Sequence, residues 1–315
     1  MKAVVTGGAG FIGSHLVDAL VTRGDEVCVI DNLSTGDLRH IAGHIDSGAV
    51  RFVRGDLLEE GWQSSIRDAN RVYHIAADPD VRASAGNPAG VYARNVTTTA
   101  RVLEAMREAG CREIAFTSTS TVYGEADIIP TPEDYPGMRP ISIYGATKLA
   151  CEAMISGYAY TYGWNSWVFR FANIIGERSN HGVIWDFAHK LRKNPRELEI
   201  LGDGRQAKSY CSVSACVDAV LFAVTHAHEP FACFNIGTED WIDVTSIASI
   251  VAAEMGLERV SFRYTGGDRG WVGDVPRMLL SVERLKSLGW RPLVTSETSV
   301  REAARALIRE SGHFP

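Results

Sequence analysis

The chain lacks an excess of basic residues and lacks any long apolar run. It carries 32 Lys and Arg against 38 Asp and Glu, which gives a formal net charge of −6. Without a basic stripe to neutralise phosphates, we expect no nucleic-acid partner. No apolar segment approaches the ~20 residues that span a bilayer, and no signal peptide precedes the first expected strand. We therefore expect no membrane partner and a cytoplasmic location.

Cysteines are few, and their spacing fits neither a metal site nor a disulfide framework. The six are Cys28, Cys111, Cys151, Cys211, Cys216 and Cys233. We expect reduced thiols that serve as small core residues, as in cytosolic proteins, and no metal site. With 315 residues and 45% hydrophobic content, the chain is long enough for a large core and two domains.

The first glycines follow a short apolar run at residues 2–6, which predicts a strand, a phosphate-binding loop and a helix. Gly7 permits a tight turn, Gly10 lets the backbone approach a pyrophosphate, and Gly13 lets the helix pack close to the strand. The free amides at the start of the helix would receive the anion. This pattern predicts a dinucleotide site.

An acidic residue stands where this kind of site needs one. A helix at 14–23 and a second strand at 26–30 lead to Asp31. A carboxylate there accepts hydrogen bonds from the adenosine ribose and repels a 2′-phosphate, so we expect NAD and not NADP. The alternative is that Asp31 only caps the loop at 31–34.

Further strands are expected at 49–53, 71–77, 113–116 and 167–173, alternating with helices. This alternation predicts an α/β fold, a Rossmann-type doubly wound parallel sheet with a smaller mixed α/β C-terminal substrate domain. We expect the NAD-binding domain at 1–172, completed by about 208–238, and the substrate domain at 173–207 and 239–315.

Tyr144 and Lys148 are four residues apart on an expected helix, downstream of the hydroxyl-rich run at 117–124 that contains Thr119. Side chains at this spacing are neighbours on one helix face, so the ammonium would lower the phenol's pKa toward neutrality. Such a group can abstract a proton from a sugar hydroxyl. The pair alone would more often be a packed aromatic beside a solvated charge, but the glycine loop favours the catalytic interpretation.

Together these motifs resemble the extended short-chain dehydrogenase/reductases, and within them the UDP-glucose 4-epimerase-like family. The resemblance covers nearly the whole chain. The motifs that carry it are TGGAGFIG at 6–13, DNLS at 31–34, STSTVYG at 118–124, YGATK at 144–148, RFAN at 170–173, LGDG at 201–204, NIG at 235–237 and LGWRP at 288–292.

The resemblance implies a mechanism with Thr119, Tyr144 and Lys148 as catalytic residues. Tyr144, as a phenolate, would take the proton from the sugar 4-hydroxyl, and Thr119 would hydrogen-bond the same oxygen. Lys148 would also hold the nicotinamide ribose, while NAD takes up a hydride from C4 and returns it to the other face of the sugar. A UDP-sugar substrate and a homodimer are likewise implied.

The resemblance also implies two sets of binding residues. The cofactor set is Gly7, Gly10, Phe11, Ile12, Gly13, Asp31, Asn32, Ser34, Thr35, Gly36, Asp56, Leu57, Ala76, Ala77, Asn95, Ser118, Tyr144, Lys148 and Phe171. The substrate set is Thr119, Tyr144, Asn173, Gly182, Val183, Lys208, Tyr210, Arg269, Asp274 and Met278. In the second set, Arg269 matches the arginine that clamps the UDP diphosphate, and Lys208 stands where many relatives have another arginine.

Alternatives to a UDP-glucose and UDP-galactose 4-epimerase stay open. Relatives that dehydrate or decarboxylate sugars carry carboxylates after the Thr119 position, where this chain has Ser120 and Thr121, so those activities are disfavoured. Met278 neither admits nor excludes an N-acetyl group, and only Arg178 lies in the loop where uronate-specific relatives hold an arginine. An NAD-binding regulator would have no use for the proton-transfer residues.

Overall fold

The structure is a computed structural model that describes residues 1–271 and 273–310. Val272, between the predicted substrate residues Arg269 and Asp274, and residues 311–315 of the expected second domain lie outside the described part. Unit 1 comprises Met1–Val122, Ser142–Arg170 and Val217–Phe234. Unit 2 comprises Tyr123–Ile141, Phe171–Cys216 and the chain from Asn235 onward. The segment Tyr123–Ile141 thus groups with unit 2, although the sequence placed it in the first domain.

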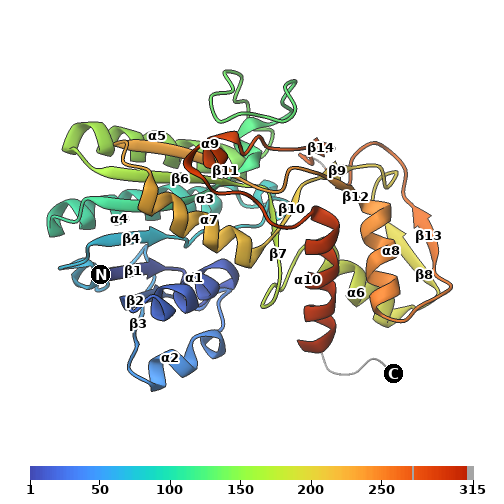
Figure 1. Ribbon diagram of the computed structural model, residues 1–315, viewed down its shortest axis with the longest axis horizontal. Coiled ribbons are helices and arrows are strands. Elements are labelled where there is room, and N and C mark those ends of the chain that lie inside the picture. The colour runs from blue at the N-terminus through green and yellow to red at the C-terminus, as the bar shows by residue number, and fades with distance from the viewer. Residues whose placement is uncertain (272, 311–315) are drawn as a thin grey trace. The chain divides into compact units, whose positions relative to one another are not determined.

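Unit 1 is built on a seven-stranded sheet with the strand order β11-β6-β5-β4-β1-β2-β3 (Figure 1). The strands are β1 (Lys2–Thr6), β2 (Glu26–Asp31), β3 (Val50–Arg54), β4 (Arg71–His74), β5 (Glu113–Thr119), β6 (Asn165–Phe171) and β11 (Phe231–Ile236). β1 pairs in parallel with β2 and with β4. The strand order therefore reverses direction between β1 and β4, which is where doubly wound sheets bind ligands. The expected fold class is confirmed.

The helices of unit 1 are α1 (Phe11–Thr22), α2 (Ala42–Asp46), α3 (Pro88–Tyr92), α4 (Thr98–Ala109) and α5 (Ile143–Tyr162), and α7 (Val213–His226) belongs largely to it. Short 3-10 turns occur at Leu38–His40, Gln63–Ile66, Ala83–Ala85 and Ser120–Tyr123. A π-helical turn at Ala93–Thr97 separates α3 from α4. π-Helical turns are rare in proteins, and those that occur are often found at functional sites.

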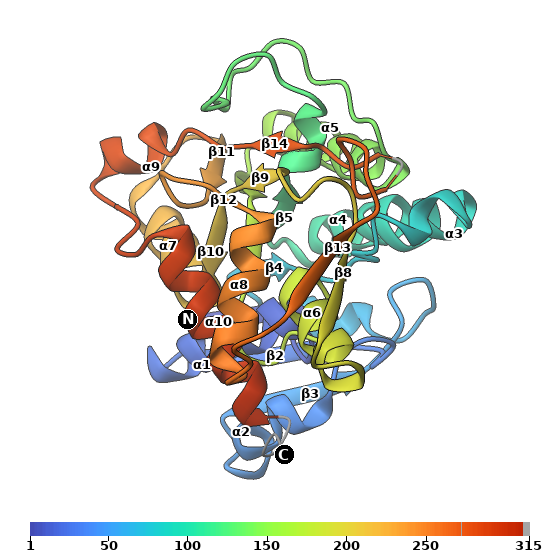
Figure 2. The same ribbon diagram turned by 90° about the vertical axis from the view of Figure 1, so that its right-hand side faces the viewer.

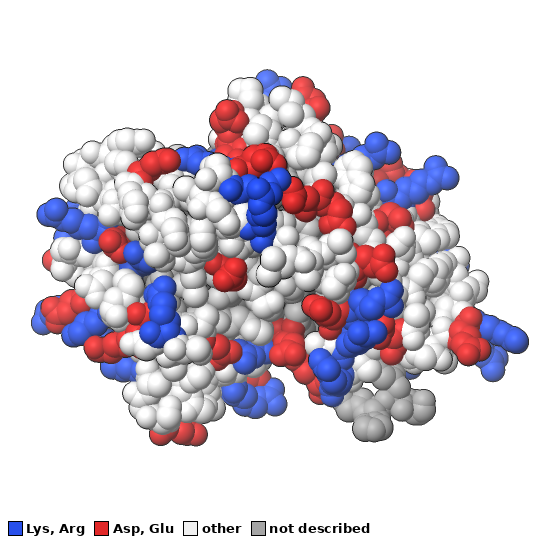
Figure 3. All heavy atoms as spheres, in the orientation of Figure 1, with Lys and Arg blue, Asp and Glu red and all other residues white. Residues whose placement is uncertain are grey.

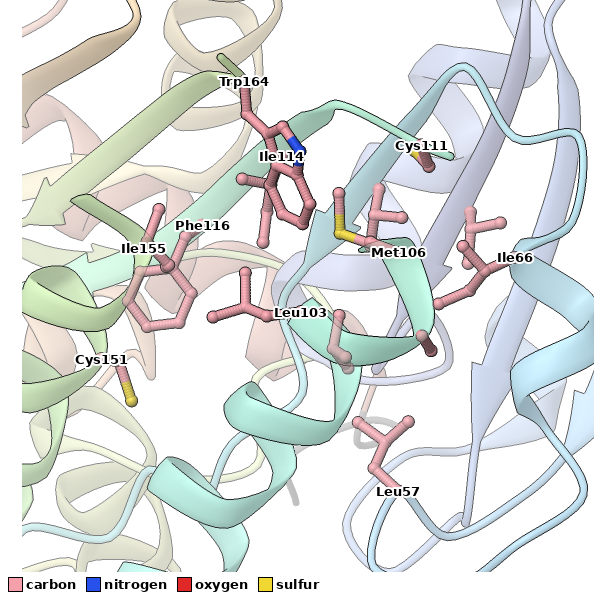
Figure 4. Close-up of a cluster of buried hydrophobic side chains, with 14 of the residues drawn as sticks. Leu57, Ile66, Leu103, Met106, Cys111, Ile114, Phe116, Cys151, Ile155 and Trp164 are labelled. Atoms are coloured by element: carbon pink, nitrogen blue, oxygen red, sulfur yellow. The ribbon is translucent and has the colours of Figure 1, made fainter. Parts of the chain in front are cut away.

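The core of unit 1 anchors α4 and α5 against β5 (Figure 4). Leu103 and Met106 of α4 and Ile155 of α5 are fully buried with Ile114 and Phe116 of β5. Full burial of each such side chain stabilises the fold by about 1.5–3 kcal/mol. The helix that carries Tyr144 and Lys148 is therefore held firmly on the strand that carries Thr119. All six cysteines are buried, as expected for small core residues.

Unit 2 is a mixed α/β unit with three small sheets: β10-β7, β12-β9-β14 and β13-β8. Its strands are β7 (Asn173–Ile175), β8 (Glu197–Ile200), β9 (Ala207–Lys208), β10 (Tyr210–Ser212), β12 (Ile242–Asp243), β13 (Ser261–Tyr264) and β14 (Arg277–Met278). Its helices are α6 (Val183–Lys193), α8 (Val244–Glu254), α9 (Glu283–Leu288) and α10 (Ser296–Glu310). Apolar faces of α6, α8 and α10 form its core; the three helices can be followed in Figure 2.

The surface carries charges of both signs, and acidic and basic side chains alternate over the face seen in Figure 3. This arrangement agrees with the absence of a basic stripe in the sequence. No helix within the described ranges has the length and apolar character needed to cross a membrane. The same described residues contain no group of three or more His, Cys, Asp or Glu side chains that could hold a metal ion.

Candidate active site

The glycine loop between β1 and α1 has the geometry that a dinucleotide site needs. Gly7 has a φ of +71°, and a Cβ there would lie 2.7 Å from the amide nitrogen of Ala76. A Cβ on Gly13 would lie 2.1 Å from the Gly7 carbonyl oxygen. A Cβ on Gly10 would meet only that same oxygen, at 3.3 Å. Gly7 and Gly13 are thus required by the protein's own packing, whereas Gly10 leaves space beside the first turn of α1.

Phe11 and Ile12 begin α1 and present the backbone amides of its first turn. Amides in this position have no partner inside the helix, and they carry the positive end of the helix dipole. They suit the pyrophosphate of a dinucleotide.

Asp31 ends β2 beside the glycine loop and is 7% exposed. One of its oxygens accepts the Ala9 amide at 2.9 Å, and the other accepts the Leu33 amide at 2.8 Å. Asp31 therefore does cap the loop, as the alternative interpretation held. A carboxylate has about four acceptor positions, so this role is compatible with further bonds to a ribose diol.

The loops after β2 and β3 meet around Asp31. The Asn32 side chain donates to Asp56 at 3.0 Å, and the Ser34 amide donates to Asn32 at 3.0 Å. Gly36 lies against Ala9, since a Cβ on Gly36 would lie 3.0 Å from the carbonyl carbon of Ala9. The side chains of Ser34 and Thr35 are exposed next to this cluster.

Three further members of the predicted cofactor set offer mainly their backbone. The Leu57 side chain is buried in the core of unit 1, so only its main chain is available to a ligand. Ala76 donates its amide to the Thr6 carbonyl at 3.0 Å, and with Ala77 it follows β4 at the reversal point of the strand order. The glycine loop, Asp31 and these small residues fit NAD.

β5 and α5 bring the three proposed catalytic residues together. Thr119 ends β5, and its hydroxyl is near enough to the Tyr144 phenol to act on its pKa as a hydrogen-bonding group. Ser142 caps α5 by accepting the Gly145 amide at 3.1 Å, which places Tyr144 in the first turn. Lys148 is 2% exposed, and its ammonium donates to the Thr117 carbonyl at 2.7 Å.

The electrostatics of this group differ from the expectation. Burial raises the pKa of Tyr144 above its ordinary value; the Thr119 hydrogen bond acts in the opposite direction, and the charge of Asp78 adds to the rise. Burial lowers the pKa of Lys148 to about 8, while Cys151 and Glu152 act to raise it. The predicted lowering of the phenol's pKa is thus not produced by the protein's own groups, because the desolvation of a phenolate outweighs them.

Asn95 lies in the π-helical turn and is 3% exposed. Its side-chain oxygen accepts the Asp78 amide at 2.8 Å, and its nitrogen donates to the Thr147 hydroxyl at 3.0 Å. Asn95 therefore joins the loop after β4 to α5. Its side chain positions α5 as well as lying among the predicted cofactor residues.

Sequence reasoning missed a buried ion pair beside this group. Arg170 of β6 and Glu152 of α5 lie 2.7 Å apart with side chains 5% and 4% exposed. Ser118, the residue before Thr119, donates its hydroxyl to Glu152. The spacing of four residues between Lys148 and Glu152 was the available signal, because it places both on one helix face.

In unit 2, the predicted diphosphate residues cluster around Asp274. The Lys208 ammonium lies 2.6 Å from an Asp274 carboxylate oxygen, and Arg269 donates to the Asp274 carbonyl at 3.0 Å. Arg269 also forms an ion pair with Glu125. Met278 of β14 is in register with Lys208 of β9. Four members of the predicted substrate set are therefore neighbours.

The other predicted residues of unit 2 lie on different elements. Asn173 starts β7, pairs with Tyr210 of β10, and donates its side-chain amide to the Ser209 carbonyl at 3.1 Å. Burial raises the pKa of Tyr210 above its ordinary value. Gly182, with a φ of +96°, precedes Val183 at the start of α6, and Phe171 is buried at the end of β6.

Comparisons with known proteins agree with this geometry. The family described as NAD dependent epimerase/dehydratase matches residues 3–237. A putative UDP-glucose 4-epimerase of Methanocaldococcus jannaschii is 33% identical over 95% of each chain. A crystal structure of a UDP-galactose 4-epimerase is 44% identical, covers 98% of this chain and 99% of its own, and superposes with a TM-score of 0.88.

A second crystal structure, of UDP-glucose 4-epimerase with UDP-glucose from Thermotoga maritima, is 30% identical, with 99% and 100% of the two chains covered and a TM-score of 0.89. The glycine loop and Asp31 are the parts of this chain that fit the nicotinamide dinucleotide in the family's name. The chain belongs to the NAD dependent epimerase/dehydratase family.

Proposed function

We propose that this protein is an NAD-dependent 4-epimerase of a UDP-hexose that interconverts UDP-glucose and UDP-galactose. The observation that carries the proposal is the grouping of Thr119 at the end of β5 with Tyr144 and the buried Lys148 of α5, in the same unit as the glycine loop. Full-length relatives and solved structures named as 4-epimerases support it.

In this proposal Tyr144 takes the proton of the sugar 4-hydroxyl and later returns it, and Thr119 hydrogen-bonds the same oxygen. Bound NAD supplies the acceptor and donor for the hydride at C4. Since burial alone raises the pKa of Tyr144, a nearby positive charge is needed to bring the phenol to a useful pKa. Lys148, and the positively charged nicotinamide ring, would supply it.

The residues after Thr119 disfavour elimination. Ser120 and Thr121 open the 3-10 turn after β5, and the Thr121 hydroxyl lies 3.1 Å from that of Thr119. A hydroxyl cannot replace the carboxylate that removes a proton or protonates a leaving water in a dehydratase. Proton removal and return at a single carbon is what these side chains support.

The sugar beyond its C4 centre is the open part of the proposal. Lys208 and Arg269 are suited to the diphosphate, and Arg269 can offer a bidentate fork. UDP-N-acetylglucosamine and UDP-glucuronate remain alternatives. Met278 is half-buried and flexible, so it neither admits nor excludes an N-acetyl group, whereas a uronate would need a cation such as Arg178.

We also propose a homodimer through the face formed by α3 and α5 of unit 1. Tyr92, Tyr160 and Tyr162 are 57%, 70% and 44% exposed there. Exposed aromatic side chains of this size are typical of protein interfaces. Sedimentation equilibrium should give twice the chain mass, and Tyr160→Glu should shift it toward the monomer. A cytoplasmic location stays a prediction.

The test of the activity is conversion of UDP-galactose by the purified protein with NAD, followed by separation of the two hexose products. The panel should include N-acetylated and uronic UDP-sugars, which decides between the alternatives. Tyr144→Phe should abolish conversion and keep NAD binding. A wild-type protein that binds NAD and inverts no UDP-sugar would refute the proposal.

A further inference from the structure

The buried ion pair of Glu152 and Arg170 lies between β5, β6 and α5, next to the proposed proton-transfer residues. Glu152 accepts the Arg170 guanidinium through both of its oxygens, at 3.1 Å, 3.2 Å and 2.7 Å. It also accepts the Ser118 hydroxyl. Placing two charges in the core costs desolvation free energy, and a pair of apolar side chains would often stabilise the fold equally well. This location therefore calls for a role besides stability.

The contacts link β5 to α5 at two successive residues. Lys148 donates to the Thr117 carbonyl, and Glu152, one helix turn further on, accepts from Ser118. These two bonds set where α5 lies along β5. The next residue of the strand is Thr119, whose hydroxyl must reach Tyr144 at the start of the same helix.

The surroundings of Lys148 explain why a negative charge is needed there. Its ammonium is almost fully buried and lies 4.6 Å from the centre of the Phe116 ring. The titratable and charged groups around it are Tyr144, Cys151 and Glu152 on α5, His74 on β4, and Arg170 on β6 behind Glu152. His74 and Cys151 are held neutral near pH 7, because burial lowers the pKa of the first to about 3 and raises the pKa of the second. Glu152, in its ion pair with Arg170, is the carboxylate of this set.

We propose that Glu152 is a positioning residue for the proton-transfer group: fixed by Arg170, it seats Ser118 and supplies the negative charge that keeps Lys148 protonated inside the core. Arg170 holds the carboxylate in place, so that it acts on the ammonium from across one helix turn. The activity measurement below rests on the proposed function, whereas the titration of Lys148 does not.

The first measurement is an NMR titration of the lysine ε-CH₂ groups in the full-length protein with NAD, using Lys148→Arg to assign the signal. The wild-type Lys148 midpoint, which burial lowers from the ordinary pKa of a lysine, is the reference. In Glu152→Gln the midpoint should fall by about one pH unit, because a charge one helix turn away is lost. In Glu152→Asp it should return toward the wild-type value.

The second measurement is the pH profile of kcat/KM for the UDP-sugar that the wild type inverts. The alkaline limb should move to lower pH in Glu152→Gln by the same amount. Glu113→Gln is the matched control, since Glu113 forms a half-buried ion pair with Arg71, 2.8 Å apart, at the opposite end of β5. It should leave both the NMR midpoint and the alkaline limb unchanged.

A Lys148 midpoint that does not move in Glu152→Gln would overturn the inference, even if that variant is less stable or less active at every pH. If Glu152→Gln does not fold, Glu152→Gln combined with Arg170→Gln removes both charges. A downward shift is still expected, but a smaller one, because the more distant positive charge of Arg170 is lost as well. An inactive wild type would refute the proposed function, while the NMR titration would still decide the role of Glu152.

Discussion

Alanine at Gly10 and at Gly13 should separate the packing role of the glycine loop from its binding role. A Cβ on Gly13 would lie 2.1 Å from the Gly7 carbonyl oxygen and 2.9 Å from the Gly7 carbonyl carbon. These are backbone atoms that cannot rotate away, so the overlap of more than ~1 Å must displace α1 or the loop. Overpacking of this kind costs about 3 kcal/mol, more than the ~1 kcal/mol that alanine gains over glycine in a helix.

Gly10 differs because its own backbone tolerates a side chain. It has a φ of −77° and a ψ of −179°, which alanine adopts readily, and its nearest contact would be 3.3 Å. Gly10→Ala should therefore leave the free energy of unfolding unchanged or raise it by up to about 1 kcal/mol, since the unfolded chain loses entropy. The added methyl would instead stand where the pyrophosphate approaches. We expect NAD affinity to fall at least tenfold, which is about 1.4 kcal/mol.

The assay is urea unfolding of both variants after NAD removal, followed by NAD titration of each. Gly13→Ala should shift the unfolding midpoint of the NAD-free protein, and Gly10→Ala should not. The reasoning is refuted if Gly10→Ala destabilises the NAD-free protein as much as Gly13→Ala does. It is equally refuted if Gly10→Ala binds NAD as tightly as the wild type.

Three other predictions concern charge. Glu125→Gln frees Arg269 from an exposed ion pair and should tighten UDP binding, measured by calorimetry at low salt, roughly two- to fivefold; Glu239→Gln, which removes a similar exposed partner of another cation, should not. His74 is fully buried, and its pKa is lowered to about 3. As the pH falls, the unfolded state therefore binds a proton at this histidine before the folded state does. The free energy of unfolding should fall by about 2 kcal/mol from about pH 7 to about pH 5, and His74→Gln should flatten that part of the stability curve. Asp31→Ser should lower NAD affinity and reduce the preference for NAD over NADP, measured by competitive titration; an unchanged preference would contradict the assigned role of Asp31.

The fold class and the family can be predicted from the sequence, because both are indicated by local patterns. The alternation of strands and helices, the spacing of Gly7, Gly10 and Gly13, and Asp31 at the end of a strand are visible without a structure, since each is set by backbone geometry over a few residues. The same holds for the four-residue spacing of Tyr144 and Lys148.

The pKa values in the site and the ion pairs between distant residues depend on the tertiary structure. Arg170 and Glu152 lie on different elements, so no local sequence pattern reveals their ion pair. The pair forms only when β6 is placed beside β5 and α5. In the same way, the depth at which Tyr144 lies decides that burial outweighs its neighbours in setting its pKa. Desolvation and long-range contact depend on how the whole chain packs, so no local pattern encodes them.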